Sequence, residues 1–137
     1  MTFFRRKQLP PDLRDPLLAF REVLAEVEPA KDALTAVMPT TRLPGRSLPD
    51  ALMEFEERLT KAGDAMAGWR RPETESVWIE CRDGLAAAIE GAARLRAQAP
   101  DLGGFEGLIW AVESLLDPLE PFHDAAARFR SLRVSAR

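Results

Sequence analysis

The sequence has little of what disulfide frameworks and membrane anchors require. It holds one cysteine, Cys81, so no disulfide can form within the chain, which suits a reducing compartment such as the cytoplasm. No apolar run approaches the roughly 20 residues that a membrane-spanning helix needs. Residues 1–11 place charges behind two phenylalanines, and no apolar stretch follows, so we expect no secretory signal. We therefore expect a cytoplasmic protein without a membrane span.

Histidine is as scarce as cysteine: His123 is the only histidine in the sequence. Glu120 and His123 have the Glu-x-x-His spacing of ferritin-like di-iron bundles, but one chain lacks the second histidine that such a site needs. A symmetric dimer could supply two copies, although nothing in the sequence requires one. Helical periodicity places His123 on the apolar face of its helix. We interpret it as a histidine at the edge of the core, bonded to a neighbouring carboxylate.

Other marks of chemistry are missing as well. The sequence has no glycine-rich phosphate loop, no Cys/His cluster and no nucleophile elbow. Its net charge of −3 produces no global field that attracts nucleic acid or an anionic membrane. We therefore expect no cofactor, no bound metal and no nucleic-acid partner.

What the sequence does contain is a helical pattern. Apolar residues recur at alternating steps of three and four in four segments, as they do on one face of an α-helix. Ser47 forms a capping-box-like start for the second segment. The pattern predicts helices near 13–38, 48–70, 73–98 and 104–133, and no sheet. The expected buried stripe of the first segment consists of Leu13, Leu17, Phe20, Leu24, Val27, Lys31, Leu34 and Met38. That of the second consists of Leu48, Leu52, Phe55, Leu59, Ala62, Met66 and Trp69, and that of the third of Trp78, Cys81, Leu85, Ala88, Ala92, Leu95 and Ala99. That of the fourth consists of Phe105, Leu108, Val112, Leu115, Leu119, Phe122, Ala126 and Phe129.

Short connections between these segments favour antiparallel neighbours. The predicted fold is therefore all-α, an antiparallel up-down-up-down four-helix bundle over residues 13–133. We expect residues 1–12 to be a flexible basic and aromatic arm, and residues 134–137 to be a tail. Proline lacks the backbone donor that an α-helix uses, so we expect kinks in the first helix at Pro29 and in the fourth near Pro118 and Pro121.

Four acidic residues have a spacing that is used by one class of enzymes. Glu54-x-x-Glu57 is followed further along the chain by Glu80-x-x-Asp83. This spacing resembles that of the all-α nucleotide pyrophosphatases of the MazG type, in which four carboxylates hold Mg²⁺ against a triphosphate. The resemblance covers these four positions alone, and it implies a Mg²⁺-dependent hydrolase. All four residues point away from the predicted stripes, so the other interpretation is a set of solvated faces.

Basic residues are expected to gather at one pole. In an antiparallel bundle the chain ends and the connection between the second and third helices share one end of the molecule. The residues predicted there are Arg5, Arg6, Arg70, Arg71 and Arg130. One interpretation is a docking site for an anion or an acidic partner. The other is that helix C-termini favour arginine in any case.

Some large apolar residues lie outside the stripes. They are Val77 and Ile79 beside Trp78, and Ile109 and Trp110 beside Leu108. Exposed apolar patches of this kind often mark interfaces. We therefore expect a small non-enzymatic helical bundle that acts by self-association, as a dimer or larger oligomer, or by binding a protein partner. The alternative is the Mg²⁺-dependent hydrolase.

Overall fold

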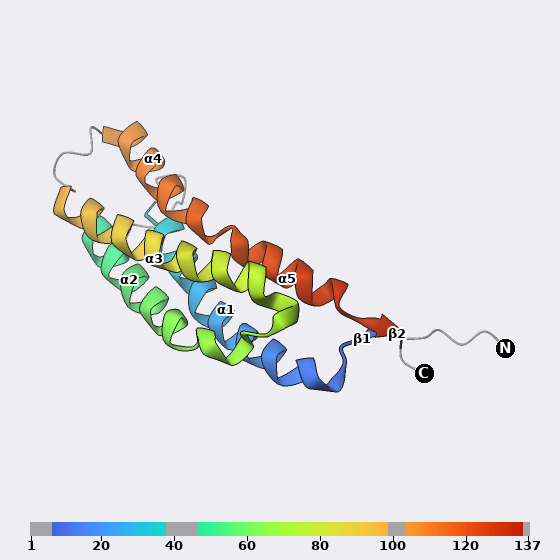
Figure 1. Ribbon diagram of the computed structural model, residues 1–137. Helices are drawn as coiled ribbons and strands as arrows, with labels where there is room; N and C mark the ends of the chain where they lie inside the picture. The colour runs from blue at the N-terminus through green and yellow to red at the C-terminus, as the bar shows by residue number, and fades with distance from the viewer. Residues whose placement is uncertain (1–6, 38–46, 99–103, 136–137) are drawn as a thin grey trace.

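The helical pattern of the sequence produces helices packed along one another (Figure 1). The structure is a computed structural model that describes residues 7–37, 47–98 and 104–135. Within these ranges the predicted all-α bundle is confirmed. In the same ranges no helix is both long enough and apolar enough to cross a membrane.

The helices begin and end close to the predicted positions. The α-helices are α1 Arg14–Thr35, α2 Leu48–Asp64, α3 Glu75–Gln98, α4 Gly104–Leu116 and α5 Pro121–Ser131. Short 3-10 helices flank them: η1 Pro11–Leu13, η2 Met66–Trp69, η3 Pro72–Thr74 and η5 Asp117–Leu119. The predicted cap at Ser47 is present, because its hydroxyl oxygen accepts a hydrogen bond of 3.3 Å from the backbone N–H of Asp50.

The chain passes along the long axis of the molecule several times. In Figure 1, α1 leads away from the end where the termini lie, and α2 returns toward that end. Next, α3 leads away again, and α4 followed by α5 returns. The turn between α2 and α3 consequently lies at the same end of the molecule as α5.

Two prolines divide the fourth predicted helix. Pro118 and Pro121 each lack a backbone N–H, so two donors are lost within one turn. The chain responds by tightening into η5, and the backbone N–H of Glu120 bonds to the carbonyl of Asp117 at 3.1 Å. By contrast, a single donor is lost at Pro29, and α1 continues through it from Arg14 to Thr35. A bend at Pro29 stays a prediction.

This break is packed tightly against α3. A methyl group on the buried Gly84 would overlap the carbonyl oxygen of Pro118. Only glycine allows the two backbones to approach this closely. Gly84 thereby fixes where the divided segment crosses α3.

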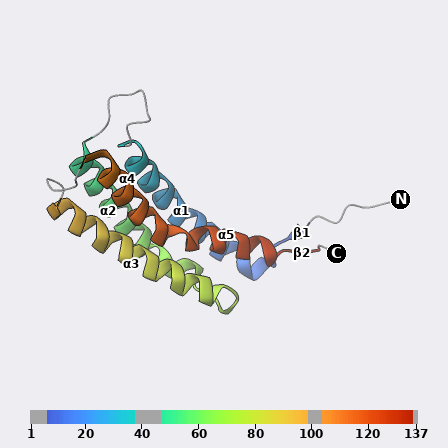
Figure 2. The ribbon, with the colours of Figure 1, turned by 90° about the horizontal axis from the view of Figure 1, so that it is seen from above.

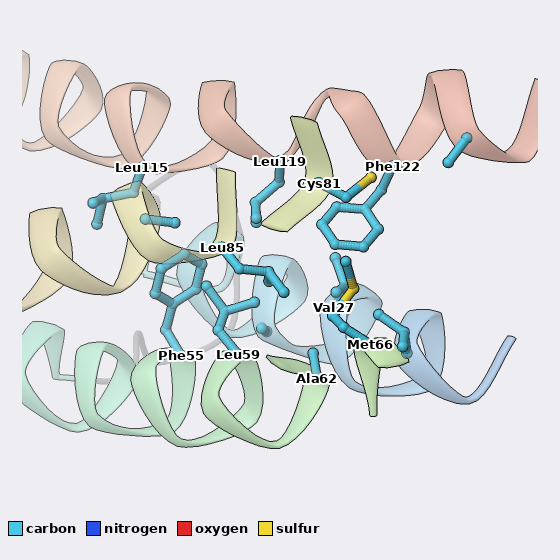
Figure 3. Close-up of a cluster of buried hydrophobic side chains, with 14 of the residues drawn as sticks. Val27, Phe55, Leu59, Ala62, Met66, Cys81, Leu85, Leu115, Leu119 and Phe122 are labelled. Atoms are coloured by element: carbon cyan, nitrogen blue, oxygen red, sulfur yellow. The ribbon is translucent and has the colours of Figure 1, made fainter. Parts of the chain in front are cut away.

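The core takes side chains from every helix. Figure 3 shows Val27 of α1, Phe55 and Leu59 of α2, Leu85 of α3 and Phe122 of α5 pointing into the same core. In α2 and α3 the predicted stripes are confirmed over the described residues, apart from Leu48, which is half-buried. The buried members are Leu52, Phe55, Leu59, Ala62, Met66, Trp69, Trp78, Cys81, Leu85, Ala88, Ala92 and Leu95.

In α1 every second position of the predicted stripe was wrong. Phe20, Val27 and Leu34 are buried as expected, but the residues between them that are buried are Pro16, Val23 and Ala30. The expected Leu17, Leu24 and Lys31 are only half-buried. Lys31 therefore stands at the rim of the core, where its Nζ lies 3.9 Å from Oε1 of Glu28. Smaller side chains at the buried positions let α1 approach its neighbours, while the leucines cover the flank.

The two ends of the chain meet, which the sequence did not indicate. Strand β1, Lys7–Gln8, pairs antiparallel with β2, Val134–Ser135 (Figures 1 and 2). Leu9 is 8% exposed and belongs to the core. Residues 7–9 are thus held to the bundle, in contrast to the expected flexible arm, and the expectation of no strand pairing was wrong here. A ladder of two residues is too short to leave a periodic signal.

Candidate functional site

Glu120 and His123 lie on the wall of a surface groove. The groove has a volume of about 390 Å³ and separates α1 from the break between α4 and α5. The prediction of a core-edge histidine was wrong: His123 is exposed, and its side chain makes no hydrogen bond within the described ranges. Phe122 occupies the core position instead. The predicted apolar stripe of this segment continues through η5, since Leu115, Leu119, Phe122 and Phe129 are all buried, and His123 lies beside that stripe with its side chain exposed.

This groove is acidic without resembling a metal centre. Its charged lining residues are Glu28, Lys31, Asp117, Glu120 and Asp124, together with His123. Nowhere in the part of the chain that the structure describes do three or more His, Cys, Asp or Glu side chains converge as metal ligands would. The groove therefore supplies no geometry for redox or hydrolytic metal chemistry.

The four carboxylates with the pyrophosphatase-like spacing are not brought together. Oε1 of Glu54 lies 3.5 Å from Nε of Arg58, whose Nη1 lies 3.3 Å from Oε2 of Glu26 on α1. The carboxylate of α2 that reaches α3 is that of Glu56, at 3.1 Å from Nη1 of Arg96. Among the described residues, the four carboxylates do not converge as a group of metal ligands.

The remaining members of the quartet are exposed. Glu57 pairs with Lys61 of its own helix at 3.6 Å, and Asp83 pairs with Arg82 at 3.2 Å. Glu80 is exposed on α3. Exposed ion pairs of this kind contribute little to stability, about 0–1 kcal/mol each. These positions match the solvated-face interpretation.

Arg70 and Arg71, at the turn between α2 and α3, are already engaged. Nη2 of Arg70 lies 2.8 Å from Oε1 of Glu75, and its guanidinium lies 4.2 Å from the ring centroid of Trp78. The hydrogen bond from Arg70 holds the pKa of Glu75 below its ordinary value and raises the pKa of Arg70. Nε of Arg71 lies 4.0 Å from Oε2 of Glu73. Arg70 is thus hydrogen-bonded to a carboxylate of its own turn, whereas Arg71 has only the longer contact with Glu73.

Arg130 lies away from this turn. Its neighbour Arg128 donates from Nε to the carbonyl of Glu73 at 2.8 Å, so that face of α5 adjoins η3. Two residues correspond to about 200° of rotation, which places Arg130 on nearly the opposite side of α5. Arg5 and Arg6 lie outside the described residues. The predicted pole therefore divides, and its parts do not form one site among the described residues.

Arg130 belongs instead to a groove between α1 and α5. This hollow of about 220 Å³ also carries Arg21 and Arg133, above a floor of Leu17, Phe20, Leu24, Ala126 and Phe129. A second hollow of about 310 Å³ continues it and shares Leu17 and Arg133, adding Lys7, Gln8, Leu9 and Arg14. We call the two hollows together the α1–α5 groove. The sequence did not single out Arg21, because only the packing of α5 on α1 brings it beside Arg130.

The three tryptophans have different environments. Nε1 of Trp69 donates to Sδ of Met66 at 3.3 Å, and Nε1 of Trp78 donates to the carbonyl of Met66 at 2.8 Å. Both indoles are buried, whereas Trp110 on α4 is 71% exposed. Of the other apolar residues outside the stripes, Val77 and Ile79 are packed against the core. Among the large apolar side chains of the described residues, Trp110 is thus the most exposed, ahead of Leu18, Met53 and Val134.

Trp110 lies at the edge of a small apolar hollow between α3 and α4. The hollow has a volume of about 230 Å³ and is lined by Ala87, Gly91, Arg94, Leu95, Gln98, Trp110, Ala111, Ser114 and Leu115. Its floor is shallow because Gly91 lets Leu115 lie close to α3: a Cβ on Gly91 would be 2.9 Å from Cδ2 of Leu115. We call Trp110 and this hollow the α3–α4 face.

Cys81 is the buried thiol that the sequence predicts. Burial raises its pKa to about 12, and the negative charges of Glu80 and Asp124 add to the rise. A thiol with so high a pKa is a poor nucleophile at neutral pH. Cys81 is a core side chain (Figure 3).

The chain matches no family model, no curated protein and no solved structure. Its function must therefore be inferred from its own surfaces. The two that stand out among the described residues are the apolar α3–α4 face and the basic α1–α5 groove.

Proposed function

We propose that this protein acts by association and not by catalysis, and that it forms a homodimer through the α3–α4 face. The observation that carries the proposal is the 71% exposure of Trp110 directly beside an apolar hollow. Tryptophan is enriched among the residues that dominate binding energy at interfaces. A reducing location such as the cytoplasm suits the single buried thiol of Cys81.

The hollow supplies a fitting receptor for an indole. Ala87 presents a small, exposed side chain on its lining, so an aromatic ring can approach the backbone of α3 there, beside Leu115, which lies against Gly91. Leu95 and Leu115 supply apolar surface at its base. Each square ångström of apolar surface removed from water contributes about 25 cal/mol, and an indole has a large area to bury.

The α3–α4 face is self-complementary, because it carries both the protruding indole of Trp110 and a hollow that can receive one. When two identical copies meet around a two-fold axis, the same patch is used twice. Trp110 of each copy can then enter the hollow of the other, giving two equivalent contacts. No second kind of surface is needed, which is why a second copy of this chain is the partner we propose.

The first test is the oligomeric state at micromolar concentration, measured by sedimentation velocity. We expect a dimer for the wild-type protein and a monomer for Trp110→Ala. Met53→Ala is the matched control, because Met53 is 56% exposed on α2, away from this face, and its loss should leave the dimer intact. A monomeric wild-type protein, or an equal effect of both substitutions, would contradict the proposal.

A mixing experiment tests the exchange of side chains itself. Ala87→Arg blocks the hollow but keeps the indole, and Trp110→Ala removes the indole but keeps the hollow. Each variant alone loses both contacts of the dimer. A mixture restores one contact, so we expect a heterodimer weaker than the wild-type dimer but tighter than either variant alone. If mixing restores nothing, Trp110 does not enter this hollow.

A further inference from the structure

The α1–α5 groove carries an unusual concentration of unpaired positive charge. Arg14, Arg21, Arg130 and Arg133 are all exposed, and none of them makes an ion pair within the described ranges. No acidic side chain lines either hollow. In a chain of net charge −3, this groove is a local reversal of the overall sign.

Basic residues elsewhere behave differently. Arg58, Arg70, Arg94 and Arg96 each contact a carboxylate of this chain, at distances between 2.8 and 3.5 Å. Arg128 donates to the backbone carbonyl of Glu73 instead. The arginines of the α1–α5 groove remain available to an external acid, and like charges held this close repel until one binds.

The groove is also apolar at its base. Leu17, Leu24 and Ala126 are half-buried along this base, above the nearly fully buried rings of Phe20 and Phe129, which are 5.1 Å apart. Leu18, next to Leu17 on α1, is 55% exposed. An occupant that suits this groove must therefore carry negative charge and apolar side chains together.

The spacing of the charges fits a helix. Arg14 and Arg21 are two turns apart on one side of α1, about 10.5 Å at 1.5 Å per residue. Arg130 and Arg133 form the opposite rim. Acidic residues two turns apart on an amphipathic helix would face this row while its apolar stripe lies on the floor.

We propose that the α1–α5 groove binds an acidic amphipathic segment of another protein. Glutamates or aspartates of the segment pair with Arg14, Arg21, Arg130 and Arg133, and its apolar side chains contact Leu17 and Leu24. Charge complementarity selects the acid and the apolar floor selects a peptide over a nucleic-acid backbone, which offers phosphates but no apolar side chains to bury. This site is separate from the α3–α4 face and does not rest on the proposed dimer.

The test uses a fluorescent helical peptide of about 20 residues with glutamates two turns apart and leucines between them, a length at which helices become stable in water. Its control replaces each glutamate by glutamine. Fluorescence anisotropy with the full chain should show binding of the glutamate peptide alone. Binding should weaken as salt rises, because exposed charges are screened over about 8 Å at physiological ionic strength.

Variants locate the binding. Arg21→Glu/Arg130→Glu should weaken it by about tenfold or more, since exposed charge pairs each contribute up to about 1 kcal/mol and reversal adds repulsion. Lys61→Glu/Arg82→Glu makes the same change in net charge on exposed faces of α2 and α3, and should bind as the wild type does. Arg21→Gln/Arg130→Gln gives the same answer should charge reversal impair folding. Trp110→Ala should keep peptide binding, so failure of the dimer and failure of this site are distinguishable.

Several results would overturn the proposal. Equal losses in the two Glu double variants would mean that only net charge matters. Equal binding of the glutamine peptide would remove the role of the acids. Absence of peptide binding, or binding only of single-stranded RNA or of phosphatidylserine vesicles to the wild-type protein, would show that the groove does not recognise an acidic protein segment.

Discussion

A tryptophan is buried at one end of the bundle, and another is exposed at the opposite end. At the end where α2 turns into α3, Trp69 is buried, and the ring of Phe20 meets it edge-on at 4.8 Å. Phe129 of α5 closes the same cluster, 6.1 Å from Trp69. At the end formed by α4, Trp110 is 71% exposed. The same residue type thus stabilises the fold at one end and remains available for association at the other.

The largest expected effect is the difference in unfolding free energy between substituting the buried Trp69 and substituting the exposed Trp110. Trp69→Ala removes a buried indole from an aromatic cluster and should lower the free energy of unfolding by about 3–5 kcal/mol. Trp110→Ala, measured where the protein is monomeric, should change it by about 0.5 kcal/mol or less. Denaturant unfolding at low protein concentration makes the comparison. Equal losses would mean that Trp110 is covered within the chain.

A smaller effect is expected where the division of the fourth helix meets α3. Gly84→Ala places a methyl group against the carbonyl of Pro118 and should lower the free energy of unfolding by about 1–3 kcal/mol. Gly63→Ala is the matched control, because nothing lies within 4 Å of a Cβ built there. It should raise the free energy of unfolding by about 0.5–1 kcal/mol, since alanine favours a helix more than glycine does. A neutral Gly84→Ala would show that the α4–α5 break is not fixed by this contact.

The smallest effect concerns Arg70 and Glu75 at the buried-tryptophan end. Because the pKa of Glu75 is lowered in the folded protein, this pair stabilises the fold above the ordinary pKa of a glutamate. That stabilisation is lost as the pH falls from the unfolded pKa through the lowered folded one. Glu75→Gln should therefore melt slightly lower than the wild type at pH 7, and the difference should disappear in acid. A difference that persists at low pH would have another cause.

The sequence predicted best where polar and apolar residues leave one choice of face. In α2, Phe55 and Leu59 alternate with Glu54 and Arg58, so the stripe is unambiguous. In α1, Leu17 and Leu24 adjoin Pro16 and Val23, and either series keeps helical spacing. The packing of α1 against its neighbours decides which of the two series is buried. The periodicity of a single sequence does not show how helices pack against one another.

Of the two candidate surfaces, the sequence indicated Trp110 of the α3–α4 face but not the grouping of arginines in the α1–α5 groove. Trp110 stood out because it lies beyond the apolar stripe of its own helix, a local property. The grouping of Arg21 with Arg130 depends on how distant helices pack, so no local pattern shows it. His123 was misplaced although Leu119, Phe122 and Phe129 of its predicted stripe are buried, because helical periodicity places a neighbour of Phe122 near the core without deciding whether its side chain is covered. Local periodicity thus predicts the buried stripe better than it predicts the residues at the edge of the stripe.

The central claim is that Trp110 becomes buried only when two copies meet, and 19F NMR of protein labelled with 5-fluorotryptophan tests it most directly. The three tryptophans should give three resonances, which Trp→Phe variants assign. On dilution from the dimer to the monomer, the Trp110 resonance should shift toward that of an exposed indole while those of Trp69 and Trp78 stay in place. A Trp110 resonance that is independent of concentration, or concentration-dependent shifts at Trp69 or Trp78, would contradict the account.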